Sequence, residues 1–155
     1  MKIKSILIAL VAILLLVGIV FLIVLGVTRE KDYTAHLIAE MEDEQMVTAK
    51  NVFSFKFHKA YVFDDPYISG EDFAKKHGLN ISISQVKSGT SENIQRIVFV
   101  DDLGHFVYEF KCDSGEVLIA EKGIVIYPET VIERLSPEGE KSLKITFKSM
   151  EKYDK

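Results

Sequence analysis

The sequence predicts an α+β protein in which one transmembrane helix precedes a single sheet-rich domain. Three observations predict this class: an unbroken apolar segment over residues 6–27, a helical pattern after it, and a run of short alternating segments separated by Gly, Asp and Pro turns. Because strands follow one another without long helices between them, we expect an antiparallel β-meander of about five to seven strands with one or two helices.

Residues 6–27 have the length and composition of a membrane-spanning helix. At about 1.5 Å per residue the segment is roughly 33 Å long, enough for a hydrocarbon core of about 30 Å. Lys2 and Lys4 precede it and charged residues follow it directly. We predict a cytoplasmic leader (1–5) and a retained signal-anchor helix (6–27). A cleaved signal is the alternative, but its apolar region is usually shorter.

Orientation follows from the positive charges, which stay on the cytoplasmic side. Three positive charges precede the apolar segment, on Lys2, Lys4 and the terminal amine, and two follow it, on Arg29 and Lys31. The prediction is a single-pass protein of the cell membrane, with its N-terminus inside and its domain outside the cytoplasm. A domain that faces the cytoplasm remains the alternative, because so short a leader can itself be translocated.

Charge bounds the partners of the chain. Lys2 and Lys4 precede the apolar segment, so 17 of the 19 basic residues remain against 23 acidic ones, a formal charge of −6. Such an acidic domain lacks the basic surface that neutralises phosphates, so nucleic acid is not expected as a partner. Glycine-rich phosphate loops are also missing, so no nucleotide is expected. The expected partners are the lipid bilayer, through residues 6–27, and an envelope protein or peptide.

Residues 28–49 are predicted to form a juxtamembrane helix, and residues 50–155 the domain. Good helix formers and an apolar spacing from Leu37 to Met46 predict the helix. It is either a stalk that dimerises or, with greater weight, a helix packed on its own domain, because the apolar stripe is too short for sustained heptads.

The segment 53–63 is predicted as the first strand, because its aromatic residues share one parity. We interpret that face as core rather than as a sugar or peptide platform. The turn Asp64-Asp65-Pro66 ends the strand, and Ser69 and Gly78 mark the start and the end of a short helix. The later strands are predicted at residues 81–87, 93–100, 105–112, 116–120, 123–127, 130–135 and 142–149.

The stretch from FSFKFHKAYVFDDPY through RIVFVDDLGHFVYEF, residues 53–110, resembles small uncharacterised membrane-anchored or lipoprotein-like proteins of Gram-positive bacteria. Phe57-His58 stands where those proteins often have a Trp-Asp pair. The resemblance implies a bacterial envelope location and carries no activity, cofactor or catalytic residue. No Cys ends the apolar segment, so a lipid-anchored precursor is excluded.

The side chains with possible chemistry do not form a motif. The spacing of the four histidines is not that of a metal-binding motif. The two Asp pairs are more typical of turns than of calcium-binding loops. These residues are His36, His58, His77, His105, Asp64, Asp65, Asp101 and Asp102. Cys112 continues the parity of Phe110, which indicates a buried, inert thiol. No serine lies in a hydrolase motif.

We therefore predict no catalytic, cofactor-binding or metal-binding residue, and no cofactor. The favoured function is a non-enzymatic binding module outside the cytoplasm. The alternatives are a small envelope hydrolase or metal-dependent enzyme built from the Asp and His loops, and a cytoplasm-facing regulator of a membrane complex.

Overall fold

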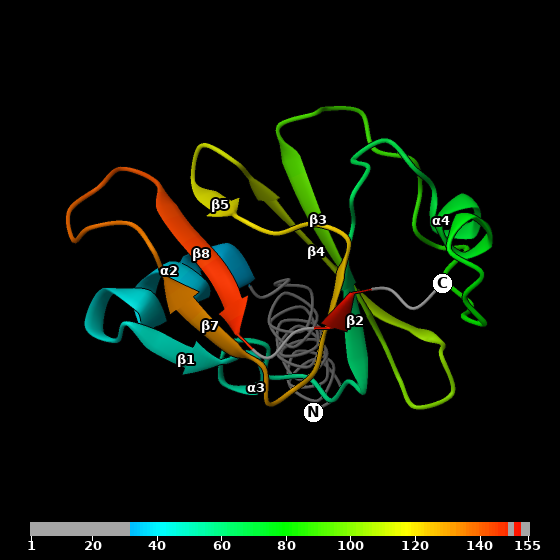
Figure 1. The fold of residues 1–155 in the computed structure, drawn as a ribbon, viewed down its shortest axis with the longest axis horizontal. Coiled ribbons are helices and arrows are strands. Elements are labelled where there is room, and N and C mark those ends of the chain that lie inside the picture. Colours follow the sequence, from blue (N-terminus) through cyan, green and yellow to red (C-terminus); the bar gives the residue numbers. More distant parts are fainter. Residues whose placement is uncertain (1–31, 149–150, 153–155) are drawn as a thin grey trace, which may run out of the picture. The chain divides into compact units, whose positions relative to one another are not determined.

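The domain is α+β, with two β-sheets rich in antiparallel pairs and few helices (Figure 1). The computed structural model describes residues 32–148 and 151–152. Its helices are α2 (Tyr33–Asp43), α3 (Ala49–Val52) and α4 (Gly70–Lys76). Its strands are β1 (Met46–Thr48), β2 (Lys59–Val62), β3 (Ile94–Val100), β4 (Phe106–Asp113), β5 (Val117–Ile119), β6 (Ile124–Ile126), β7 (Val131–Arg134), β8 (Leu143–Lys148) and β9 (Glu151–Lys152).

The predicted membrane helix, residues 6–27, and the leader before it lie outside the described residues. The chain divides into two compact units, one that ends at Asp32 and one that begins at Tyr33. No helix in the part that the structure describes is long and apolar enough to cross a membrane.

The strands form two sheets rather than one meander. The four-stranded sheet has the order β1-β7-β8-β5, and the five-stranded sheet has the order β4-β3-β2-β6-β9. Among the described residues, only β3–β4 and β7–β8 are hairpins between consecutive strands, and β5 pairs with β8 in parallel. The meander prediction was wrong on this point because short connections can also carry the chain from one sheet to the other.

A main core fills the space between the two sheets. Inward residues of both sheets meet there, together with the buried side chains of α2 and α3. Tyr33, Leu37 and Met41 recur every four residues on one face of α2 and enter this core, so α2 packs on its own domain.

A second core lies on the opposite face of the five-stranded sheet, where Phe73 of α4 packs beside Val98 and Val100. Burial on both faces explains why Ile97 to Val100 of β3 form a continuous apolar run and why six of the seven residues of β3 are buried. Figure 1 shows α4 on the side of the five-stranded sheet away from the four-stranded one.

The helix predicted over residues 28–49 ends at Asp43. Three acidic residues in a row, Glu42 to Glu44, oppose the negative end of a helix dipole, and β-branched Val47 and Thr48 favour the strand that follows. Residues 46–48 instead form β1, whose register pairs Val47 with Ile132 of β7.

The strand predicted over residues 53–63 is also shorter, because only Lys59–Val62 forms a strand. Phe53 and Phe57 belong to the core between the sheets, whereas Tyr61 and Phe63 belong to the second core. The aromatic residues are therefore mostly core, as interpreted, but they do not share one face.

Residues 81–87 form no strand beyond a single parallel bridge between Ser82 and His105. The helix α4 agrees with its sequence signals. Ser69 caps its first turn by accepting a hydrogen bond from the Asp72 amide at 3.1 Å, and Gly78 takes the left-handed φ of 65° after its last turn.

Candidate functional site

Asp64 and His77 come together beside α4, where they hold the turn after β2 against the helix. Asp64 Oδ2 accepts a hydrogen bond from Lys76 Nζ at 3.2 Å, and its Oδ1 lies 3.5 Å from His77 Nε2. Burial raises the pKa of Asp64, but the hydrogen bond and charge of Lys76, with the charge of His77, outweigh it and lower this pKa below its usual value. Asp65 closes the turn by accepting the Tyr67 amide at 2.8 Å.

Asp101 has a comparable role in the β3–β4 turn. Its Oδ1 accepts the amides of Leu103 and His105, at 2.9 and 2.8 Å. The His105 amide, followed by the Leu103 amide, lowers the pKa of this exposed carboxyl. Gly104 in the same turn has φ of 80°, a conformation that favours glycine. The carboxylate therefore organises its own turn.

Three of the sequence candidates, His58, Asp101 and Asp102, line one open pocket of about 390 Å³, together with Lys56 and Phe57. His77 and Asp64 lie together beside α4, and His105 lies 3.4 Å from Asp101, so the Asp and His residues of the loops divide between two places. Among the described residues, no three His, Cys, Asp or Glu side chains are placed to hold one metal ion. His36 lies on α2, 4.0 Å from Glu40.

Cys112 is a core residue. Its side chain is 3% exposed, and burial, with the charges of Asp113 and Glu116, raises the pKa of its thiol to about 12. A thiol of this kind holds almost no thiolate near neutral pH, so it does not serve as a nucleophile.

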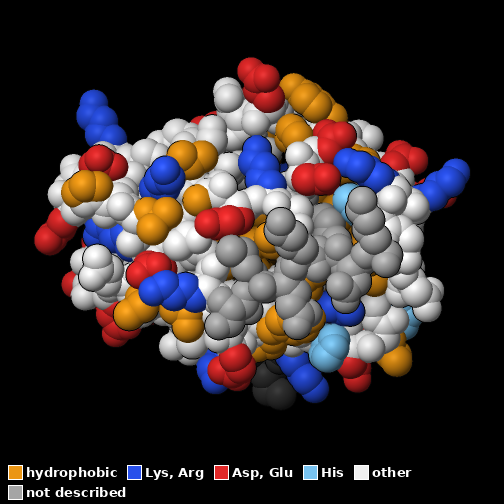
Figure 2. All heavy atoms as spheres, in the orientation of Figure 1, with side chains coloured by type: hydrophobic (Ala, Val, Ile, Leu, Met, Phe, Trp, Pro, Cys, Tyr) orange, Lys and Arg blue, Asp and Glu red, His pale blue; other side chains and the backbone are white. Residues whose placement is uncertain are grey.

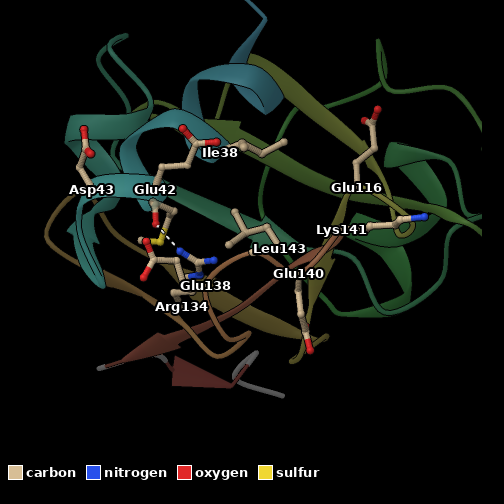
Figure 3. A pocket seen from close by; sticks show the side chains of 11 residues that line it. Ile38, Glu42, Asp43, Glu116, Arg134, Glu138, Glu140, Lys141 and Leu143 are labelled. Atoms are coloured by element: carbon tan, nitrogen blue, oxygen red, sulfur yellow. Dashed lines mark hydrogen bonds between the residues drawn. The ribbon is translucent and has the colours of Figure 1, made fainter.

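One pocket is lined by charged and apolar side chains from segments that are far apart in the sequence. It lies between the end of α2 and the β7–β8 hairpin (Figure 3). We call it the α2 pocket, and its volume is about 400 Å³. It is lined by Ile38, Met41, Glu42, Asp43, Glu116, Arg134, Glu138, Gly139, Glu140, Lys141 and Leu143. A neighbouring hollow of about 300 Å³ shares Met41 and Arg134 with it and extends to Gln45.

The floor of the α2 pocket is apolar. Met41 and Leu143 are 1% and 8% exposed and belong to the core between the sheets, while Ile38 is partly buried against the same core. Figure 3 shows Leu143 at the middle of the pocket, between the α2 side and the hairpin side. The pocket therefore offers an apolar surface that is continuous with the folded core.

Arg134 positions the walls of the pocket. Its guanidinium donates three hydrogen bonds of 3.0 Å to backbone carbonyls: Nε to Ser136, Nη1 to Met41 and Nη2 to Pro137. The bond to Met41 satisfies a carbonyl in the last turn of α2, where a cation also complements the helix dipole. Arg134 thus ties the helix end to the hairpin.

The rim is acidic. Five carboxylate residues line the pocket against two cations, Arg134 and Lys141, and all five are exposed; they are Glu42, Asp43, Glu116, Glu138 and Glu140. Figure 3 places Glu138 beside Arg134, Glu42 with its carboxylate turned toward Ile38, Glu116 near Lys141 on the opposite side, and Glu140 pointing away. Within the described residues Arg134 forms no ion pair with any of them, so their charge is not neutralised there.

A second arginine, Arg96, organises the other end of the domain. It is 1% exposed, and its Nε binds Glu109 Oε1 at 2.7 Å. Its remaining nitrogens donate to the carbonyls of Pro66, Ile68 and Lys87, at 3.2, 2.7 and 2.6 Å. The backbone of Gly89 lies close to the Pro66 carbonyl. Only glycine fits at this position, because a Cβ there would lie 1.8 Å from the Pro66 carbonyl oxygen.

Sequence reasoning missed the α2 pocket and both arginines. The pocket joins residues 38–43 to residues 134–143, which are far apart in the chain, and neither arginine lies in a motif. One usable signal was present, the unusual density of Glu and Asp in both segments. The chain matches no protein-family model, and no similar curated protein or solved structure was found.

Proposed function

We propose that the chain is a single-pass protein of the cell membrane, anchored by residues 6–27, whose domain lies outside the cytoplasm and binds a partner without catalysing a reaction. The anchor rests on the length and apolar composition of those residues. The orientation rests on Lys2, Lys4 and the positive-inside rule.

The α2 pocket is the observation that carries the binding function. A side chain of the partner can bury the apolar floor of the pocket. Polar groups around an apolar pocket fix the orientation of the ligand and supply specificity. The acidic rim favours a partner segment that presents Lys or Arg, whose long aliphatic stems cover apolar surface while the charged ends stay among the carboxylates. We propose a basic segment of an envelope protein or peptide as this partner.

The first test is photo-crosslinking in intact membranes. A photoreactive phenylalanine analogue replaces Lys141 at the rim of the pocket, and a matched variant carries it at Lys75, an exposed lysine on α4. We expect one discrete crosslinked product from position 141 and none from position 75. The same product from both positions, or from neither, contradicts binding at the α2 pocket.

Membrane orientation requires its own test. An enzyme reporter that is active only outside the cytoplasm is fused after Lys155, with a reporter active only inside as the control. Activity of the outside reporter is expected. Activity of the inside reporter alone contradicts the proposed orientation and favours the cytoplasm-facing regulator.

A small envelope hydrolase is the second candidate, because His58, Asp101 and Asp102 share one pocket. Its test is a panel of ester, phosphoester and peptide substrates, offered to the purified full chain and to a His58→Ala variant. Turnover that is lost in the variant favours this candidate. Turnover that is absent, or equal in both proteins, is the result expected of a binding module.

A further inference from the structure

Among the described residues, the outer edge of β4 is the longest strand edge of the two sheets; the Phe106 amide at its start donates to the Ser82 carbonyl at 3.1 Å, and the edge has no neighbouring strand beyond that residue. β4 is the last strand of the five-stranded sheet in the described part of the chain, with β3 on its other side. The hydrogen bond from the Phe63 amide to the Arg96 carbonyl shows that Arg96 directs its backbone groups toward β2. Residues of β3 alternate in this direction, so Ile97 and Phe99 direct theirs toward β4.

The register of the β3–β4 pair then fixes which groups of β4 face outward. Ile97 pairs with Phe110 and Phe99 with Tyr108, so these two residues of β4 form the hydrogen-bonded pairs. The backbone N–H and C=O groups of Glu109 and Lys111, which lie between and beyond them, point away from the sheet. They form a template for another strand.

We propose that a second copy of the chain pairs with this edge, β4 antiparallel to β4 about a two-fold axis at Phe110, joining two five-stranded sheets into one. In this register the outward-facing Glu109 lies opposite Lys111 of the second copy, and the reverse pair forms by symmetry. The overlap covers residues 107–113. An axis at Glu109 or at Lys111 would place like charges opposite each other, and an axis at Cys112 would pair only residues 111–113.

The side chains at the edge are arranged for this pairing. Glu109 is held in place because its Oε1 binds Arg96, and its Oε2 lies 3.1 Å from Lys111 Nζ of the same chain. A second Lys111 therefore meets a fixed carboxylate oxygen, and opposite charges directly across two antiparallel strands are stabilising. A membrane-anchored chain also meets its copies at high local concentration, which favours a small isologous interface.

The test measures the oligomeric state of the full chain in lipid nanodiscs and in native membranes, by single-molecule photobleaching and by zero-length carbodiimide crosslinking of mixed ¹⁴N and ¹⁵N chains. The expected result is a dimer that contains mixed-isotope amide links between Glu109 and Lys111. A wild-type chain that is monomeric in both membranes overturns the proposal.

Variants separate strand pairing from other modes of association. Lys111→Glu places carboxylates opposite carboxylates and is expected to weaken dimerisation roughly tenfold or more. Lys111→Pro removes an outward N–H without removing a bond to β3, and is expected to abolish the dimer. Thermal unfolding of each variant checks that the domain is intact.

Lys148→Glu is the matched control. Lys148 also pairs with a glutamate across a short distance, 2.8 Å to Glu133, and its side chain is 51% exposed against 55% for Lys111. It lies on β8, which has a neighbouring strand on each side. Lys148→Glu should leave the dimer unchanged. A dimer that survives Lys111→Pro, or that Lys148→Glu weakens as strongly as Lys111→Glu does, overturns β4 pairing.

Discussion

The domain has two arginines, Arg96 and Arg134, whose guanidinium groups make similar hydrogen bonds in different surroundings. Each guanidinium donates hydrogen bonds to three backbone carbonyls and so fastens irregular segments to a sheet. Arg96 is 1% exposed, binds Glu109 and lies 4.9 Å from the ring of Phe63. Arg134 is only partly buried and stands at the wall of an open pocket.

The difference lies in what surrounds the charge. Around Arg96, protein atoms accept a hydrogen bond from each of the three guanidinium nitrogens, and the side chain is buried, so the group contributes to the fold rather than to a surface. Around Arg134, the guanidinium is directed at backbone carbonyls while the carboxylates of Glu42 and Glu138 stay exposed. One arginine therefore closes a core, and the other shapes a surface that carries unneutralised negative charge.

Replacement of Arg96 should have the largest effect on stability. Arg96→Ala leaves the partly buried Glu109 without its partner and frees three loop carbonyls, so we expect a loss of about 3–5 kcal/mol in the free energy of unfolding. Denaturant unfolding of the domain measures this loss. A loss below about 1 kcal/mol would show that Arg96 does not fasten these loops.

Cys112 supplies an independent measure of the same change. Its buried thiol, with a pKa raised to about 12, should react with a thiol reagent only when the sheet opens. Arg96→Ala should accelerate this labelling in native buffer, while the unfolded chain labels equally fast with and without the substitution.

Replacement of Arg134 should have a smaller effect on stability and a larger one on binding. Arg134→Ala removes three hydrogen bonds at a partly solvated site, where water can replace the lost donor, so we expect a loss of about 1–2 kcal/mol. Because α2 is then released from the hairpin, crosslinking from position 141 should fall as well. Unchanged crosslinking would show that Arg134 does not shape the pocket.

Asp64 should have the smallest effect, one confined to acid conditions. Its pKa is lowered in the folded state, so the stability that it contributes is present above its unfolded pKa, near 3.8, and is lost as the pH falls through the folded value. Asp64→Asn should therefore flatten the dependence of unfolding free energy on pH below about 4. A variant with the wild-type slope would show that the contacts with Lys76 and His77 contribute nothing.

Local features were predictable from the sequence, because neighbouring residues determine them. Ser69 and Gly78 marked the limits of α4, and Asp101 with Gly104 marked the turn of the β3–β4 hairpin. The parity of Cys112 also predicted a buried thiol correctly.

Features that depend on the packing of distant segments were not predictable. Period-two alternation over 53–63 did not reveal that the regular strand begins only at Lys59, so Phe57 before it and Tyr61 within it enter different cores. Gln95 is a comparable case, because its amide bonds both backbone groups of Ile119 and so links the two sheets. The α2 pocket arises in the same way, from two segments that meet only in the fold.

The most direct test of the binding function is the crosslinking from position 141 after charge reversal at the rim. Glu42→Lys/Glu138→Lys reverses two carboxylates of the rim, and Glu71→Lys/Glu92→Lys makes the same change in net charge at exposed positions outside the pocket. We predict that the crosslinked product is lost in the first variant and retained in the second. Equal yields in the two variants would contradict an acidic pocket that binds a basic segment.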